Sequence, residues 1–127
     1  MDKAALVSVD IERGAEIIGI LDHSGLRLKV ALWAVLPEYE DWRLVVASPQ
    51  LDRPDLRNPY APIIDALVAT GFKIENTPPI VILPMTDRTI KHLRKVFGKT
   101  KRVEGMRLGG QMLGDRFVDD AYVYRIS

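Results

Sequence analysis

Four acidic residues near the C-terminus are the best candidates in this sequence for holding a metal ion. Asp115, Asp119 and Asp120, with Glu104 upstream, offer the carboxylate oxygens that a hard cation such as Mg²⁺ prefers. Their spacing argues against a shared site, because neighbouring residues of a strand point to opposite faces, so Asp119 and Asp120 cannot both join Asp115. We keep them as weak candidates only and predict no resident metal and no other cofactor.

The other reactive residue types lack the partners that a known mechanism needs. The chain has no cysteine, which excludes thiolate catalysis and disulfide bonds, and its two histidines, His23 and His92, have no catalytic context. Gly98-Lys99-Thr100 ends like a phosphate-binding loop, but the first glycine of that motif is missing and the triplet follows a predicted helix instead of preceding one. The sequence therefore identifies no catalytic residue.

The stretch RTIKHLRKVFGKTKR, residues 88–102, concentrates positive charge in a chain whose net charge is +1. Residues 1–87 carry 8 basic and 13 acidic side chains, net −5, whereas residues 88–107 carry 8 basic side chains against Glu104 alone, net +7. Local charge this one-sided attracts polyanions. Two interpretations stay open: this is the solvent-exposed face of an ordinary surface helix, or it is a surface that neutralises nucleic-acid phosphates. The predicted phosphate contacts are Arg88, Lys91, Lys95, Lys99, Lys101 and Arg102.

Helical spacing places the cations of this stretch opposite an apolar stripe. The stripe consists of Ile90, Leu93, Val96 and Phe97, which we expect to be buried. The only aromatic residue of the stretch thus lies on its buried side, so the sequence gives no support for base stacking.

Trp33 and Trp42 are the candidates for a protein interface. Trp33 lies on the strand face opposite an aliphatic run, so it is either covered by a helix or available to a partner. Tryptophan is enriched at interaction hot spots, which favours the second alternative, and it is also a common core residue, which favours the first. Both alternatives stay open.

The composition is typical of one folded domain. A chain of 127 residues, with 47% hydrophobic and 28% charged residues, is long enough to bury a core and too apolar to be disordered. We therefore expect a single α+β domain over residues 1–127. No signal peptide or membrane-spanning run is recognisable, and we expect a cytoplasmic protein with no membrane contact.

The elements that must position these residues follow from periodicity and turn chemistry. We expect a helix from Asp10 to Gly25 and then two antiparallel strands, residues 26–36 and 42–47, joined by the turn PEYED. An irregular, exposed proline-rich loop covers residues 48–62. The next helix ends at Gly71 and presents a predicted buried stripe of Ile63, Ile64, Leu67 and Val68.

The C-terminal half adds a strand, a helix and a hairpin. A short edge strand, IVILP, precedes a helix that Thr86 or Asp87 caps and that ends at Phe97. The last 25 residues form a hairpin about Gly114-Asp115, with Met112 opposite Phe117 on its apolar face. The order α-β-β-α-β-α-β-β favours an α+β fold in which helices pack on an antiparallel-dominated sheet.

Two phrases, WRLVVASP at residues 42–49 and DAYVYRI near the C-terminus, are similar to segments of a family of short uncharacterised bacterial proteins. The resemblance implies a bacterial source and carries no catalytic residue. On the residues alone we expect a non-enzymatic protein-interaction or regulatory module that binds an unknown protein partner or itself, as a homodimer. The first alternative is electrostatic nucleic-acid binding through residues 88–107. The second is a divalent-metal-dependent enzyme using the carboxylates above.

Overall fold

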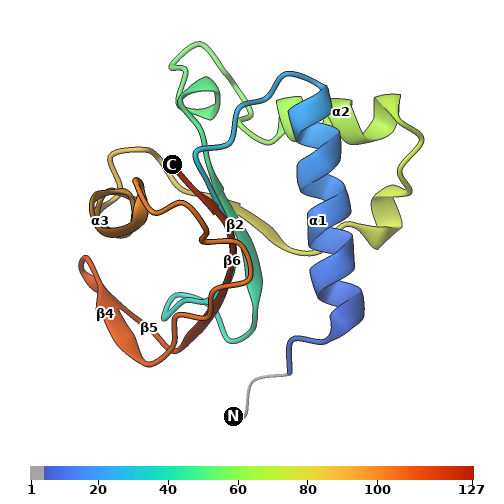
Figure 1. The fold of residues 1–127 in the computed structure, drawn as a ribbon. Coiled ribbons are helices and arrows are strands. Elements are labelled where there is room, and N and C mark those ends of the chain that lie inside the picture. Colours follow the sequence, from blue (N-terminus) through green and yellow to red (C-terminus); the bar gives the residue numbers. More distant parts are fainter. Residues whose placement is uncertain (1–4) are drawn as a thin grey trace.

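The computed structural model describes residues 5–127 and confirms an α+β domain with the predicted order of elements (Figure 1). Two short 3-10 turns interrupt the loops, at Pro49–Leu51 and Ile74–Asn76. The helices are α1 (Ser8–His23), α2 (Ala61–Ala69) and α3 (Arg88–Phe97). The strands are β1 (Val30–Val35), β2 (Arg43–Ala47), β3 (Ile80–Ile82), β4 (Gln111–Leu113), β5 (Arg116–Val118) and β6 (Asp120–Ile126).

Four strands form the central sheet in the order β3-β2-β1-β6. The predicted β1–β2 hairpin is confirmed, with Val30 opposite Ala47 and Trp33 opposite Leu44. β6 pairs antiparallel with β1 on its other side, and β3 is the edge strand, as predicted, although it runs parallel to β2. The sheet is therefore mixed, with antiparallel pairs dominating.

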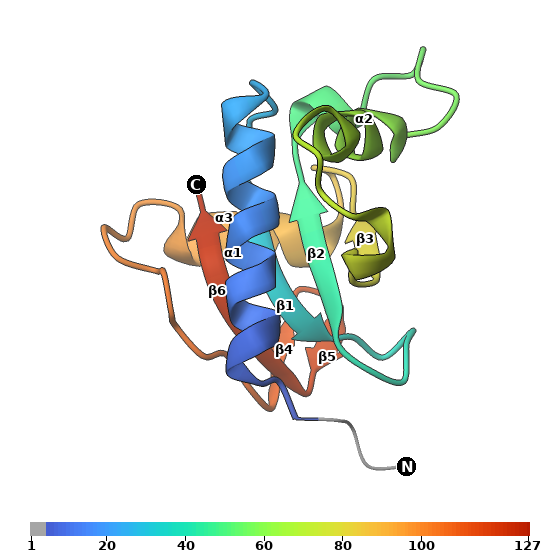
Figure 2. The ribbon, with the colours of Figure 1, turned by 90° about the vertical axis from the view of Figure 1, so that its right-hand side faces the viewer.

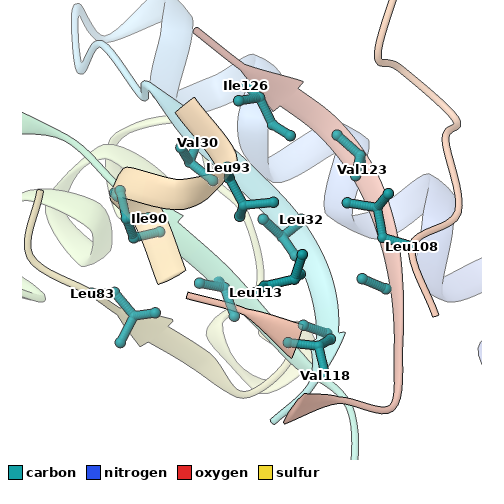
Figure 3. Packing of buried hydrophobic residues seen from close by; sticks show 14 of the residues in the cluster. Val30, Leu32, Leu83, Ile90, Leu93, Leu108, Leu113, Val118, Val123 and Ile126 are labelled. Atoms are coloured by element: carbon teal, nitrogen blue, oxygen red, sulfur yellow. The ribbon is translucent and has the colours of Figure 1, made fainter. Parts of the chain in front are cut away.

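Both faces of the central sheet are covered. α1 and α2 lie on one face, whereas α3 and the β4–β5 hairpin lie on the other (Figures 1 and 2). The alternation in residues 26–36 is typical of a half-buried strand, and that prediction is wrong, because every residue of β1 is buried between the two layers. Each face of the sheet carries a hydrophobic core. The core on the α3 side is drawn in Figure 3, and it joins Ile90 and Leu93 of α3 to Leu113 and Val118 of the hairpin.

Two predicted helical stripes are wider than the surfaces that the helices bury. In α2, Ile63 and Leu67 are buried, but Ile64 and Val68 are exposed. In α3, Val96 is exposed in the same way. Each helix lies on the sheet through one narrow line of side chains, so apolar residues at the border of that line stay in solvent.

The C-terminal hairpin has the predicted register but a different shape. Met112 pairs with Phe117, and the pairing continues to a bridge between Arg107 and Tyr122. Between them the hairpin bends at Gly110, whose φ of 59° is costly for other residues, and β6 leaves β4 and β5 to join the central sheet. The inner face carries Leu113 and Val118, so the prediction that Met112 and Phe117 form the apolar core face is wrong.

Candidate nucleic-acid interface

The N-terminus of α3 is fixed by a cap and an arginine. The Asp87 carboxylate accepts hydrogen bonds from the backbone N–H groups of Thr89 (2.9 Å) and Ile90 (3.2 Å), which satisfies donors that have no partner within the helix. Arg116 of β5 donates to Asp87 at 2.8 Å and to Glu38 at 2.7 Å. The start of α3 is thus tied both to the hairpin and to the loop that joins β1 and β2.

These contacts also set the charge state of the cap. Burial by itself would raise the pKa of Asp87, but the hydrogen bonds from Arg116 and from the backbone of Ile90 and Thr89 outweigh it, and the pKa lies below its ordinary value. The carboxylates of Asp87 and Glu38 raise the pKa of Arg116, chiefly through the hydrogen bond to Asp87. The cap is therefore an ion pair at neutral pH.

The β4–β5 hairpin packs directly against the first turn of α3. The Thr89 hydroxyl donates to the Leu113 carbonyl at 2.8 Å, and both residues are buried. At Gly114 a Cβ would lie 2.6 Å from the Arg88 carbonyl carbon, so only glycine permits this approach, and its φ is 68°. The hairpin and the helix therefore form one unit.

Packing of α3 on the sheet points its cations outward. Ile90 and Leu93 are fully buried beneath the helix, while Lys91 and Lys95 on the opposite side are exposed. Val103 is buried and anchors the loop that follows, so Lys99, Lys101 and Arg102 also lie in solvent. The structure places all six predicted phosphate contacts on the surface: Arg88, Lys91, Lys95, Lys99, Lys101 and Arg102.

Two other cations of residues 88–107 already have a hydrogen-bond or ion-pair partner. Arg107 forms an ion pair with Asp120 at 2.7 Å, and Arg94 donates to the Ser127 carbonyl at 2.7 Å. The six predicted contacts differ, because no carboxylate within residues 5–127 lies at ion-pair distance from any of them. Within the described residues, no ion pair neutralises these six side chains.

The spacing of these cations suits a phosphate backbone. Arg88, Lys91 and Lys95 follow one side of α3 over seven residues, which is about 10 Å of helix axis. Duplex DNA rises 3.4 Å per base pair, so the helix alone covers roughly three base pairs, and the loop extends that reach. Lys101 and Arg102 line a shallow hollow of about 500 Å³ beside β6.

The acidic residues weighed as weak metal candidates do not gather into one group in the described part of the chain. Among residues 5–127, no three histidine, aspartate or glutamate side chains come together as a metal would need. Asp120 is held by Arg107 and by the backbone N–H of Ala121, and Asp115 lies in the turn between β4 and β5. Asp119 precedes the first residue of β6, which is Asp120.

Both tryptophans belong to the core of this chain, which favours the first of the two alternatives for them. Trp33 is 3% exposed and Trp42 is 7% exposed. Trp33 lies beneath α1, where its indole N–H donates to the Tyr124 hydroxyl at 2.9 Å, and that hydroxyl donates to the Ile11 carbonyl at 2.6 Å. Burial is the main cause that raises the pKa of Tyr124 to about 12.

Two features were not predicted from the sequence. One is a cleft of about 390 Å³ between the start of α1, the start of β2 and the segment before β3. Arg43 and Thr77 line it, and within residues 5–127 the Nε atom of the former and the hydroxyl of the latter are buried without a hydrogen-bond partner. The other is Phe117 on the outer face of the β4–β5 hairpin, which is 50% exposed.

No protein-family model matches this chain, and no curated protein or solved structure is significantly similar to it. Among residues 5–127, no helix combines the length and the apolar character needed to cross a bilayer.

Proposed function

We propose that this protein binds nucleic acid through a cationic surface made of α3 and the loop after it. The observation that carries the proposal is the state of its six cations, which are exposed, lie within 15 residues of sequence and have no acidic partner among the described residues. Four of the chain's other arginines, Arg53, Arg107, Arg116 and Arg125, each hold a carboxylate, whereas Arg13, Arg27, Arg43 and Arg57 have no ion pair within residues 5–127.

Electrostatics supplies the affinity in this proposal. Each phosphate neutralised by a lysine or arginine releases condensed counterions, a gain that does not depend on base sequence. The cations lie on an outer surface and not in a groove-entering element with polar side chains aimed at bases, so we infer binding without sequence reading.

A charge-reversal experiment tests the proposal against simple net charge. Lys91→Glu with Lys95→Glu alters the cationic surface, whereas Arg57→Glu with Lys73→Glu makes the same change in net charge at exposed positions near α2. Fluorescence anisotropy with a labelled mixed-sequence oligonucleotide at low salt measures both.

We expect the first pair to weaken binding on the order of tenfold or more, and the control pair to weaken it much less, because only the first removes phosphate contacts. Equal losses from the two pairs would show that only overall charge matters and would refute the proposed site.

A further inference from the structure

β3 lies at one edge of the central sheet, and its outer side has free backbone groups. The Pro79 carbonyl and the Leu83 N–H both bond to β2, so these two residues face the sheet. Because backbone groups alternate in direction along a strand, those of Ile80 and Ile82 point away from it. Within residues 5–127, the only hydrogen bond on that outer side of Ile80 and Ile82 is a long one, 3.4 Å from the Ile82 N–H to the Tyr60 hydroxyl.

The sequence around this edge limits the strands that can pair with it. Natural sheets protect an edge strand with charged side chains or with proline. Residues 77–84, TPPIVILP, contain no charged side chain, but Pro78 and Pro84 are in step with Ile80 and Ile82 and lack the N–H donor. The outer edge therefore offers N–H donors at Ile80 and Ile82 alone, and the two prolines lie at equal distances on either side of Val81.

α2 carries an exposed apolar side next to this edge. Tyr60, Ile64 and Val68, at every fourth position, are 37%, 37% and 59% exposed, and Asp65 is the only charged residue of the helix. The hydrogen bond between Tyr60 and Ile82 places this side of α2 toward β3, and Figure 2 shows both elements on the side of the molecule away from β6. A helix that is apolar around most of its circumference is normally covered on more than one side.

We propose that β3 pairs antiparallel with β3 of a second copy, so that two copies share one continuous sheet with their α2 helices beside the two-fold axis. Centred on Val81, this pairing lets each Ile80 N–H donate to the partner's Ile82 carbonyl, and each Ile82 N–H to the partner's Ile80 carbonyl. The Tyr60 hydroxyl, held only at 3.4 Å, gives way to that carbonyl. The same surface is used by both copies, so the contact closes as a dimer.

The symmetry of the segment favours a second copy over an unrelated strand. In this register Ile80 faces the partner's Ile82, a cross-strand pair of β-branched residues, and Pro78 faces the partner's Pro84. The Pro84 carbonyl already accepts from the Asp87 N–H of its own chain at 2.9 Å. Pairing therefore ends on both sides at positions where neither chain has a donor to satisfy.

This inference goes beyond the proposed function and does not depend on it. Paired antiparallel strands are related by a two-fold axis perpendicular to the sheet, so equivalent faces of the two copies stay on one side. The two α3 helices then lie on the same face of the continuous sheet, opposite α1 (Figure 1). The dimer thus presents two cationic surfaces in the same direction.

Hydrogen exchange of backbone amides tests the pairing in the unmodified chain. Analytical ultracentrifugation first measures the dimer dissociation constant. The Ile80 amide should exchange about tenfold or more slowly well above that concentration than well below it, whereas the Val81 amide, which faces β2, should be protected at both. A chain that stays monomeric at the highest soluble concentration, or a dimer whose Ile80 amide still exchanges rapidly, would overturn the inference.

Three variants locate the contact independently. Ile80→Pro removes an outward donor and spares the bonds to β2, and Ile64→Lys puts a charge on the exposed side of α2. Met112→Lys is the control, because it makes the same charge change at an apolar residue that is 56% exposed on the β4–β5 hairpin.

We expect Ile80→Pro and Ile64→Lys each to raise the dissociation constant about tenfold or more, and Met112→Lys to change it by less than about twofold. Circular dichroism verifies that the variants fold, and Ile64→Lys decides the outcome if Ile80→Pro does not. If Met112→Lys dissociates the dimer while Ile64→Lys leaves it intact, the contact lies elsewhere and the proposed pairing is wrong.

Discussion

Gly14 and Gly19 of α1 provide a matched pair of substitutions that tests how the helix lies on the sheet. Gly14 is buried against Trp33 and Tyr124, and an added Cβ would lie 2.8 Å from the Trp33 indole nitrogen and nearer still to the Tyr124 hydroxyl. At Gly19 an added Cβ would meet nothing within 4 Å. The same change to alanine should therefore have opposite effects at the two positions.

The magnitudes follow from helix propensity and packing. Alanine is better than glycine inside a helix by about 1 kcal/mol, so Gly19→Ala should stabilise the protein by roughly 0.5–1 kcal/mol. Gly14→Ala gains the same amount, but overpacking costs about 1–3 kcal/mol and each hydrogen bond lost around Tyr124 about 1 kcal/mol more. We expect Gly14→Ala to lose about 1–3 kcal/mol overall.

Thermal and urea unfolding followed by circular dichroism measure both variants. For a chain of this size about 1 kcal/mol corresponds to roughly 4 °C, so Gly19→Ala should raise the Tm by about 2–4 °C and Gly14→Ala should lower it by about 4–12 °C. An unchanged urea m-value would show that the two variants unfold from the same compact state. If Gly14→Ala raises the Tm as Gly19→Ala does, α1 is not seated on Trp33 and Tyr124, and the reasoning fails.

Two further predictions concern the cap of α3. Arg116→Met leaves Asp87 without its ion pair in a site where the two side chains are 15% and 13% exposed, so urea unfolding should show a loss of about 2–3 kcal/mol, whereas Arg53→Met, in a pair that is mostly exposed, should change the stability much less. Equal losses would contradict the assigned role of the cap. Because the folded pKa of Asp87 lies below its unfolded value of about 3.9, its contribution is complete above that value and is lost as the pH falls through the folded pKa. Asp87→Asn, which can still cap the helix, should therefore reduce the fall in stability as the pH is lowered below about 4, and an unreduced fall would refute the assignment.

The alternation of apolar and polar residues predicted two of the four strand pairings within residues 5–127, those of the two hairpins. The turn chemistry of Gly114-Asp115 set the register of the C-terminal hairpin, and the structure confirms Met112 opposite Phe117. For the first hairpin, residues 37–41 predicted the pairing without its register, which places Trp33 opposite Leu44. Local rules suffice there because hairpin register depends only on the turn and the strands beside it.

The same local rules could not predict which of two apolar faces of a strand or hairpin would be buried. In the C-terminal hairpin, Leu113 and Val118 on one face compete with Met112 and Phe117 on the other, and only packing against α3 decides which face is buried. The register already implied that one apolar pair would stay outside, a signal that could have identified Phe117. The burial of Trp33 could not be predicted for the same reason, because it depends on α1, which packs above this residue.

The predicted cationic surface depended on one periodic pattern, and that pattern holds. Helical spacing put Lys91 and Lys95 opposite Ile90 and Leu93, and the structure buries the latter two residues fully. The spacing could not indicate which cations would find partners, because the contacts of Arg94 and Arg107 come from the C-terminus and from β6. Those contacts are long-range and depend on the completed sheet.

The salt dependence of oligonucleotide binding tests the central claim most directly. If all six unpaired cations contact phosphates, the slope of log affinity against log salt should be about −5 on duplex DNA and about −4 on a single strand. Lys91→Glu with Lys95→Glu should remove about two phosphate contacts and make the slope shallower by the corresponding amount. A steep slope that the double variant reduces is the result we predict. Absence of binding at low salt, or a slope that the variant leaves unchanged, would contradict the assignment of this surface to nucleic acid.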